Sequence, residues 1–384
     1  MDRVYYDHAA SSPMNPEAAK AMLEVMTGTY GNPSSTHSFG RAVRQLLNRS
    51  RDTIAHGIGC TAGELVFTGG GTESDNAALI GAARAARKQG KSHIITSATE
   101  HHAVLQSCEA LEREGFRVTI VPVDEHGIVN PADVERAIES DTALISIMYV
   151  NNETGTIQPI EEIGELARSK SVLLHVDAVQ ALGVLAIDVR QLPVDLMSFS
   201  SHKINGPQGV GALYIRKGTA VEPIQYGGSQ ERKRRAGTEN VAGIVGFAKA
   251  FELSVNSLAE RKPFLEQLRY TWIERMREIV GAEGIVVNGH PSNYAPHILN
   301  MSFIGVGTES MLMNLDLAGI AASGGSACTA GALEPSYVLQ AMNFSQERQA
   351  SAVRFSFGLG NTMEELELAA KKVATFMARV RTNA

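Results

Sequence analysis

Short apolar segments alternate with amphipathic segments through the first part of the chain. Seven segments have the length and continuous hydrophobicity of buried strands, at residues 64–68, 92–97, 117–123, 142–150, 171–177, 194–200 and 209–216. Stretches with one apolar face lie between several of them, at 103–114, 131–139 and 159–169. Strands that are apolar on both sides are usually covered on both faces. The pattern therefore predicts an α/β fold in which helices flank a mainly parallel seven-stranded sheet.

The pattern changes in the last third of the chain. Residues from about 240 to 280 have a strongly helical pattern, followed by candidate strands at 297–303 and 352–357 and candidate helices near 308–317 and 362–380. This order predicts a small α+β domain, which a long helix joins to a larger domain that contains the seven-stranded sheet.

The expected division of the chain follows from these patterns. We expect a large domain at residues 16–255 and a small C-terminal domain at residues 256–384. Residues 1–15 are expected to join the small domain, which would also carry the segment 323–336.

Composition and charge narrow the class of protein. The 384 residues are 44% hydrophobic and 20% charged, with a formal net charge of −6, as in an ordinary globular protein. This charge gives no general attraction to nucleic acid or membrane lipid, and no apolar run approaches the roughly 20 residues of a membrane helix. The first residues lack the pattern of a secretion signal, and three cysteines are too few for a disulfide framework. We therefore expect a cytoplasmic enzyme with no membrane or direct nucleic-acid partner.

Polar residues that could do chemistry follow the predicted strands. Thr72, His101, Asn152, Asp177 and Lys203 each come at or just after the end of such a strand. In sheets of this kind, ligands bind beyond the carboxyl ends of the strands. We expect these five residues to surround one ligand.

The stretch "FTGGGTESDN" at residues 67–76 joins a strand to a helix that Thr72 opens. Glycines let the backbone approach an anion, and the free N–H groups at a helix start favour phosphate. The stretch does not match the dinucleotide or Walker patterns, and a glycine turn before a helix is common. Taken alone, it leaves phosphate binding and an ordinary turn both open.

Asp177 and Lys203 are also ambiguous when each is considered alone. An acid at a strand end can be a helix cap, and a lysine after a strand is usually a solvated surface group. Here Lys203 stands among small and rigid neighbours, in "SFSSHKINGPQG", and a desolvated lysine can form a Schiff base. A phosphate cradle, an acid for a pyridinium nitrogen and a Schiff-base lysine together are what pyridoxal phosphate requires.

Ten motifs in order make the chain resemble the cysteine desulfurases along essentially its whole length. The matching stretches are "YYDHAA", "YGNPSSTHSFG", "FTGGGTESDN", "TEHHAV", "NNETG", "HVDAVQ", "SFSSHKINGPQG", "RRAGTEN", "SGGSACTAG" and "VRFSFG". The resemblance implies a class V aminotransferase-like enzyme with an aminotransferase type I fold and pyridoxal 5'-phosphate as cofactor. The chain departs from the family at Gly324, where relatives often have serine, outside the reacting position.

The resemblance also implies a role for each residue near the cofactor. Lys203 would hold the cofactor covalently, Asp177 would keep its ring nitrogen protonated, and His101 would stack on the ring and transfer protons. Gln180 would bind the ring oxygen. The phosphate would be held by Gly71, Thr72, Ser200 and His202, and from a neighbouring subunit by Thr238, which implies a homodimer. Asn152 would contact cofactor and substrate, and Arg354 would bind the substrate carboxylate bidentately.

Cys328 stands among glycine, serine, alanine and threonine, which are too small to pack it firmly. Taken alone, this cysteine is a catalytic thiol or a small buried apolar residue. The resemblance implies that it takes the sulfur of L-cysteine as a persulfide, leaves L-alanine, and carries the sulfur to an acceptor. No metal is expected in the resting enzyme, and Cys328 would contact an iron–sulfur cluster only transiently. Cys60 and Cys108 are expected to be structural.

The sequence alone leaves other functions and more than one sulfur acceptor possible. A related pyridoxal-phosphate lyase, such as one for selenocysteine, shares the fold, whereas an aminotransferase would not need Cys328. A sulfur-relay platform without turnover is disfavoured, because Lys203 and Asp177 are both present. Iron–sulfur scaffold proteins and a tRNA-thiolating enzyme are both possible acceptors. The basic stretch at 231–240 is assigned to the dimer interface and active-site rim, and its surroundings resemble the branch that serves tRNA thiolation.

Overall fold

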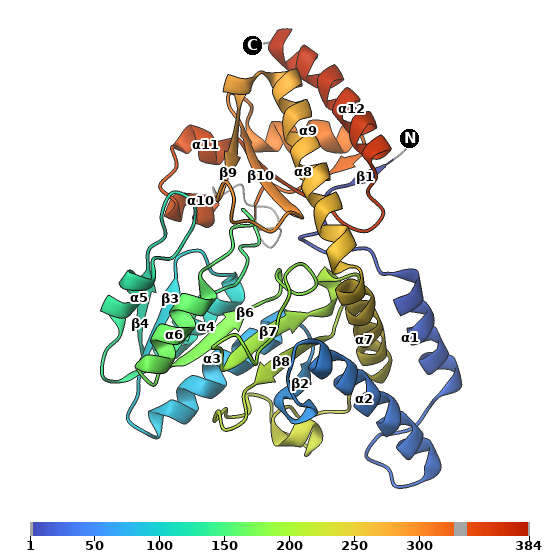
Figure 1. The fold of residues 1–384 in the computed structure, drawn as a ribbon, viewed down its shortest axis with the longest axis vertical. Coiled ribbons are helices and arrows are strands. Elements are labelled where there is room, and N and C mark those ends of the chain that lie inside the picture. Colours follow the sequence, from blue (N-terminus) through green and yellow to red (C-terminus); the bar gives the residue numbers. More distant parts are fainter. Residues whose placement is uncertain (1–2, 326–335, 383–384) are drawn as a thin grey trace.

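A seven-stranded sheet forms the centre of the larger part of the molecule (Figure 1). The computed structural model describes residues 3–325 and 336–382. The strands run in the spatial order β2-β8-β7-β6-β5-β3-β4. Their bounds are Leu65–Thr68 (β2), His93–Ser97 (β3), Arg117–Val121 (β4), Thr142–Ser146 (β5), Leu173–Asp177 (β6), Leu196–Ser200 (β7) and Gly211–Ile215 (β8). Only β8 runs opposite to the other six, so the mainly parallel sheet predicted from the apolar runs is confirmed.

Helices cover both faces of this sheet, and each strand divides its side chains between them. In β7, Leu196 packs with α3 and α4 on one face, whereas Met197 and Phe199 pack on the opposite face. This alternation is the two-residue period of a strand. The helices are α3 (Gly71–Arg87) and α4 (His102–Arg113) on the first face, and α2 (Ser38–Gly57), α5 (Pro131–Ala137), α6 (Ile160–Ser169) and α7 (Val241–Asn256) on the second. The sheet is therefore buried on both sides.

A second hydrophobic cluster lies in the smaller, upper part of the molecule in Figure 1. Its antiparallel sheet has the order β12-β10-β9. The elements are α8 (Leu258–Val280), β9 (Ile285–Asn288), β10 (Ile298–Phe303), α9 (Thr308–Leu317), β11 (Ile320–Ala321), α10 (Tyr337–Ala341), α11 (Gln346–Ala350), β12 (Ala352–Ser356) and α12 (Met363–Thr382). Trp272 is fully buried in this cluster.

The N-terminal segment packs with this smaller part before the chain enters the larger one. Strand β1 (Val4–Tyr5) pairs in parallel with β11, with Val4 opposite Ile320. Helix α1 (Pro16–Gly28) follows and packs against α7. The division of the chain at residue 255 stays a prediction.

The strongly helical pattern from about 240 to 280 is confirmed, and it corresponds to two helices, α7 and α8, that meet at 74°. Ser257 lies between them with φ −92° and ψ 0°, away from the values of an ideal α-helix, and its hydroxyl donates to the carbonyl of Leu253. Such a local side-chain bond competes with continued helix formation. Among the residues that the structure describes, no single helix is long and apolar enough to cross a membrane, and α7 and α8 meet that requirement only as this bent pair.

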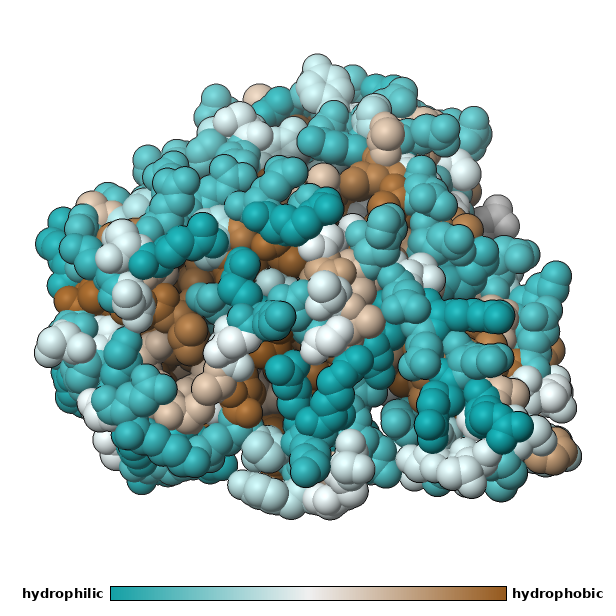
Figure 2. Space-filling view, turned by 60° about the horizontal axis from the view of Figure 1, so that its bottom comes forward, coloured by the Kyte–Doolittle hydropathy of each residue, from teal (hydrophilic) through white to brown (hydrophobic). Residues whose placement is uncertain are grey.

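The exposed face in Figure 2 is mainly hydrophilic, and hydrophobic residues show chiefly in the recesses between polar ones. Large apolar side chains that are exposed include Leu23, Met26, Tyr30 and Phe39, which lie on α1, on the following loop and at the start of α2. The rings of Tyr30 and Phe39 stack with their centroids 5.0 Å apart.

Candidate active site

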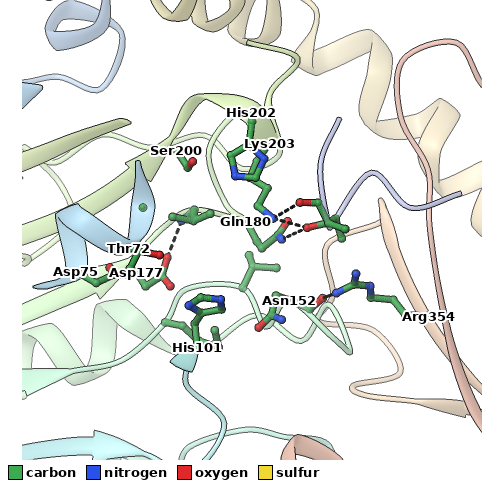
Figure 3. A pocket seen from close by; sticks show the side chains of 16 residues that line it. Thr72, Asp75, His101, Asn152, Asp177, Gln180, Ser200, His202, Lys203 and Arg354 are labelled. Carbon is green, nitrogen blue, oxygen red and sulfur yellow. Dashed lines mark hydrogen bonds between the residues drawn. The ribbon is translucent and has the colours of Figure 1, made fainter. Parts of the chain in front are cut away.

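A pocket of about 210 Å³ opens at the carboxyl ends of the parallel strands, where the smaller part of the molecule meets the sheet (Figure 3). It is lined by Ala9, Ala10, Gly71, Thr72, Asp75, His101, Met148, Val150, Asn152, Asp177, Val179, Gln180, Ser200, His202, Lys203 and Arg354. Every site residue expected from the sequence is among them except Thr238 and Cys328. The structure thus brings side chains from five strand ends and from β12 into one cavity.

One end of this pocket is an uncapped helix start. Helix α3 begins at Gly71, and no side chain caps it, so its first N–H groups stay available for an anion. A Cβ atom on Gly71 would lie 2.8 Å from Val179 Cγ2, so a larger residue would push against the opposite wall. The hydroxyl-bearing residues Thr72 and Ser200 line the same end. This end fits a phosphate group.

Lys203 reaches the middle of the pocket from η2 (Ser201–Lys203), the single turn that follows β7. Its Nζ donates to the carbonyl oxygens of Ala9 and Ala10, at 2.5 and 2.9 Å. Both carbonyls belong to the N-terminal segment, so this segment holds the amine in place (Figure 3). A lysine fixed in this way can act as a nucleophile when it loses its proton.

Asp177 ends β6 and is buried on the floor of the pocket. Its Oδ1 accepts a hydrogen bond from the N–H of Val179 at 2.9 Å, which fixes the carboxyl group. Burial raises its pKa to about 6, against the lowering effects of the Val179 N–H and the Lys203 charge. A cationic ring nitrogen placed against this carboxyl would favour the charged form. Asp177 therefore suits the role of a pyridinium partner.

His101 is the N-cap residue of α4, and its Nδ1 accepts a hydrogen bond from the N–H of Ala103 at 3.1 Å. This bond leaves the proton of the neutral ring on Nε2. Burial lowers the pKa of His101 to about 4, and the charges of Lys203 and His102 lower it further. His101 is therefore a neutral ring whose Nε2–H can serve in stacking and proton transfer.

Two further residues are fixed by bonds to the N-terminal segment. Gln180 Nε2 donates to the carbonyl of Ala9 at 2.9 Å, and the Nδ1 atom of His202 lies 3.2 Å from the hydroxyl of Ser11. Burial lowers the pKa of His202 to about 4, with a smaller effect from Lys203. His202 is therefore a neutral hydrogen-bonding group rather than a cation at neutral pH.

Arg354 enters the pocket from β12, opposite Asn152. Its Nη1 donates to the carbonyl of Asn152 at 2.8 Å and its Nη2 to Asp7 Oδ1 at 3.1 Å. The side chain is almost completely buried, yet Nε of Arg354 and Oδ1 of Asn152 have no partner among the described residues. The unpartnered Nε–H of Arg354 fits a ligand carboxylate, and the unpartnered amide oxygen of Asn152 fits a hydrogen-bond donor such as an amino group.

The two expected residues outside the pocket differ in position. Thr238 is exposed in the loop after η3 (Gln230–Lys233) and does not line the pocket of its own chain. Cys328 lies outside the described residues. The chain on either side of it is placed, because Ser323 pairs with the backbone of Arg354 and Ser336 donates to Glu153 at 2.5 Å. The described residues before and after segment 326–335 are therefore anchored at Arg354 and at Glu153, the residue that follows Asn152.

The remaining cysteines are poor candidates for chemistry. Cys108 is buried on α4, and Cys60 is partly buried after α2. Burial raises the pKa of each thiol to about 12, with smaller contributions from nearby acids. Thiols with such pKa values carry almost no thiolate at neutral pH. Within the described parts of the chain, no group of three or more His, Cys, Asp or Glu residues could hold a metal ion.

Asp75 is a pocket residue that the sequence analysis did not single out. It lies three residues after Thr72 and so on the same face of α3. That spacing was the available signal, but an aspartate on a helix is usually a solvated residue.

A phosphate-binding helix start, a fixed lysine and a strand-end aspartate in one pocket define a pyridoxal-phosphate enzyme of the aminotransferase fold. Comparison with known proteins gives the family. The chain belongs to the aminotransferase class-V family, whose model matches residues 4–368. Members of this family depend on pyridoxal phosphate, and the described residues fit that cofactor.

Named relatives and solved structures cover nearly the whole chain. It is 48% identical to a putative cysteine desulfurase IscS 1 of Bacillus subtilis (strain 168), over 99% of this chain and 100% of that protein. It is 46% identical to a cysteine desulfurase IscS of Dictyoglomus turgidum, over 99% and 95%. The solved structure of a NifS-like protein, 35% identical, matches with a TM-score of 0.92 over 98% of this chain and 100% of that one. SspA in complex with cysteine matches with a TM-score of 0.81 at 33% identity, over 92% and 98%.

Proposed function

We propose that this chain takes sulfur from L-cysteine onto Cys328 and passes it to acceptor proteins. The chain is an L-cysteine desulfurase, and L-alanine is the second product. The observation that carries the proposal is the position of Ser323 and Ser336, the described residues that flank segment 326–335. Ser323 is paired with Arg354, and Cys328 is five residues further along, within roughly 17 Å of extended chain. The thiol is therefore within reach of a substrate held at Arg354.

The described residues divide the work of binding between the two ends of the pocket. The uncapped start of α3 would hold the phosphate of the cofactor, and Arg354 would hold the substrate carboxylate at the opposite end. Between them, Lys203 would supply the amine that binds the cofactor, and Asp177 would pair with its ring nitrogen. Pyridoxal phosphate, when bound, supplies an electron sink that weakens bonds at the α-carbon of an amino acid.

The transfer of sulfur must balance. The Cys328 thiolate attacks the sulfur of the substrate, so an S–S bond forms while the substrate's C–S bond breaks. The three-carbon product gains a proton at the carbon that lost sulfur and leaves as alanine. We assign proton transfer to His101, which is neutral and carries its proton on Nε2. A thiol reductant or acceptor protein then removes the outer sulfur from Cys328.

The homodimer expected from the sequence is part of the proposal. Thr238 is exposed and lies outside the pocket of its own chain, as a residue that serves the partner's site would. The exposed side chains of Leu23, Met26, Tyr30 and Phe39 supply an apolar surface for such contact.

The acceptor is proposed to be an iron–sulfur scaffold protein or a tRNA-thiolating enzyme in the cytoplasm. Arg232 and Lys233 are exposed, so they can contact a partner protein, whereas Arg235 is paired with Glu73. Affinity purification of tagged protein, followed by mass spectrometry, identifies the acceptor.

The direct test is product analysis with the purified holoenzyme. L-cysteine with a thiol reductant should give alanine and sulfide in equal amounts, and L-aspartate should give no transamination product. Alanine from selenocysteine but none from cysteine would instead assign the chain to the related lyases.

A further inference from the structure

His297 lies just before β10, behind the wall of the pocket, and is 8% exposed. Its Nε2 atom is 3.3 Å from Oε1 of Gln180, a pocket residue. The carbonyl oxygen of His297 accepts a hydrogen bond from the N–H of Phe357 at 2.9 Å, which fixes the backbone at this position. The imidazole is therefore held against Gln180 by a part of the chain far from it in sequence.

The orientation of the Gln180 amide follows from its two neighbours. The Ala9 carbonyl can only accept, so the amide nitrogen must face it, as the 2.9 Å contact requires (Figure 3). The amide oxygen then faces His297, which must donate from Nε2. The amide nitrogen has a second N–H group, which remains for the pocket.

The charge state of His297 agrees with this hydrogen bond. Burial lowers its pKa to about 3, and the positive charges of Arg261, His8, Lys203 and Arg269 add to the effect. A neutral ring with its proton on Nε2 is a donor to Gln180, and its Nδ1 has no partner among the described residues. The ring therefore makes one side-chain hydrogen bond within the described part of the chain, and that bond is to a pocket residue.

We propose that His297 is a positioning residue that holds the Gln180 amide so that its free N–H points to the cofactor's ring oxygen. Ala9 links this arrangement to the lysine, because its carbonyl oxygen accepts from both Gln180 and Lys203. Without the donor from His297, Gln180 Oε1 is buried without a partner, and only the bond to the Ala9 carbonyl still orients the amide. The inference rests on the cofactor assignment and not on the identity of the substrate.

The test uses two substitutions of matched shape that differ in the donor. His297→Gln keeps an N–H donor at a similar reach, whereas His297→Met fills the space without one. The apo forms are titrated with pyridoxal phosphate, and the dissociation constant is measured by equilibrium dialysis. His297→Met should weaken cofactor binding about 3- to 10-fold, the effect of one lost hydrogen bond, and His297→Gln should stay within about twofold of the parent.

The same comparison in a Gln180→Ala background separates positioning from packing. There, His297→Met should add no further loss, because the group that it positions is gone. Equal losses from both substitutions, or an undiminished loss in the Gln180→Ala background, would overturn the proposal. Circular dichroism checks that each variant is folded, and His297→Leu replaces the methionine variant if that one is not. The substrate L-cysteine is not added in these measurements, so their outcome does not depend on whether the chain proves to be a desulfurase.

Discussion

Asp75 and Asp177 are two buried acids that line the same pocket, and the negative charge of Asp177 acts on the carboxyl group of Asp75. Burial raises the pKa of Asp75 well above its usual range, and the negative charge of Asp177 raises it further. The Oδ1 atom of Asp75 has no hydrogen-bond partner among the described residues. Two such carboxyl groups do not both ionise easily, so Asp75 keeps its proton and Asp177 carries the charge.

The first prediction concerns the stability of the apo protein as a function of pH. The pKa of Asp177 is raised from 3.8 to about 6, so between these values the folded chain binds more protons at this site than the unfolded chain. The contribution of Asp177 to the free energy of unfolding should therefore fall as the pH rises from about 4 to 6, whereas the lowered pKa values of His101, His202 and His297 act in the opposite direction. Denaturant unfolding of the apo parent and of apo Asp177→Asn, over pH 4–7, should show that the stability of the parent relative to the variant falls over this range, because the other groups contribute to both proteins. Parallel curves would show that Asp177 has an ordinary pKa.

The two acids should differ sharply in their importance for turnover. Asp177→Asn replaces a charged partner of the ring nitrogen by a neutral one, and we expect a loss of about 100-fold or more in kcat. Asp75→Asn replaces one neutral group by another of the same shape, so kcat should change by a few-fold at most. Steady-state alanine formation measures both. A large loss in Asp75→Asn would show that Asp75 acts as an anion.

The sheet and the ends of its strands could be predicted because each strand is a continuous apolar run that must be covered on both faces. The position of Asp177 or Lys203 at a carboxyl end then follows from topology. Helix α1 was missed although its start carries signals, since Asn15 accepts from the N–H of Glu17 and Pro16 opens the helix. The bend at Ser257, where the hydroxyl bonds back to the carbonyl of Leu253, leaves no mark in the periodic pattern.

Contacts between segments far apart in the sequence were the part of the site that was hardest to predict. The hydrogen bonds from Lys203 to the carbonyls of Ala9 and Ala10 depend on where the N-terminal segment packs. Backbone carbonyls are present at every residue, so the sequence does not show which of them a side chain will meet. Likewise, nothing local to His297 indicates that it meets Gln180. Such contacts arise from tertiary packing, which apolar patterns constrain only loosely.

Arg354 should be required for binding of the substrate carboxylate. Arg354→Lys keeps a positive charge but loses the planar pair of donors, so we expect KM for L-cysteine to rise about 10-fold with a smaller change in kcat. Arg348→Lys is the control, because Arg348 contacts Asn288 and Phe344 outside the pocket. An unchanged KM in Arg354→Lys would remove Arg354 from the substrate site.

Thr238 should act across a subunit boundary. In a heterodimer of Lys203→Ala and Thr238→Ala chains, one of the two sites regains both residues. When the two variants are mixed and allowed to exchange subunits, the mixture should therefore be more active than the average of the two separate variants. Analytical ultracentrifugation establishes the dimer first. Activity equal to that average in proven heterodimers, or a strictly monomeric chain, would contradict the shared site.

The central claim is that Cys328 receives the sulfur of L-cysteine, and the release of alanine and sulfide by single cysteine variants tests it most directly. Cys328→Ala should keep bound cofactor and its yellow colour, because the groups proposed to hold the cofactor, Lys203, Asp177 and the start of α3, are unchanged. With L-cysteine and a thiol reductant it should release neither alanine nor sulfide. Cys60→Ala and Cys108→Ala should turn over like the parent, since their thiols are buried with pKa values raised to about 12. If Cys328→Ala turns over L-cysteine as fast as the parent does, the sulfur does not pass through this thiol.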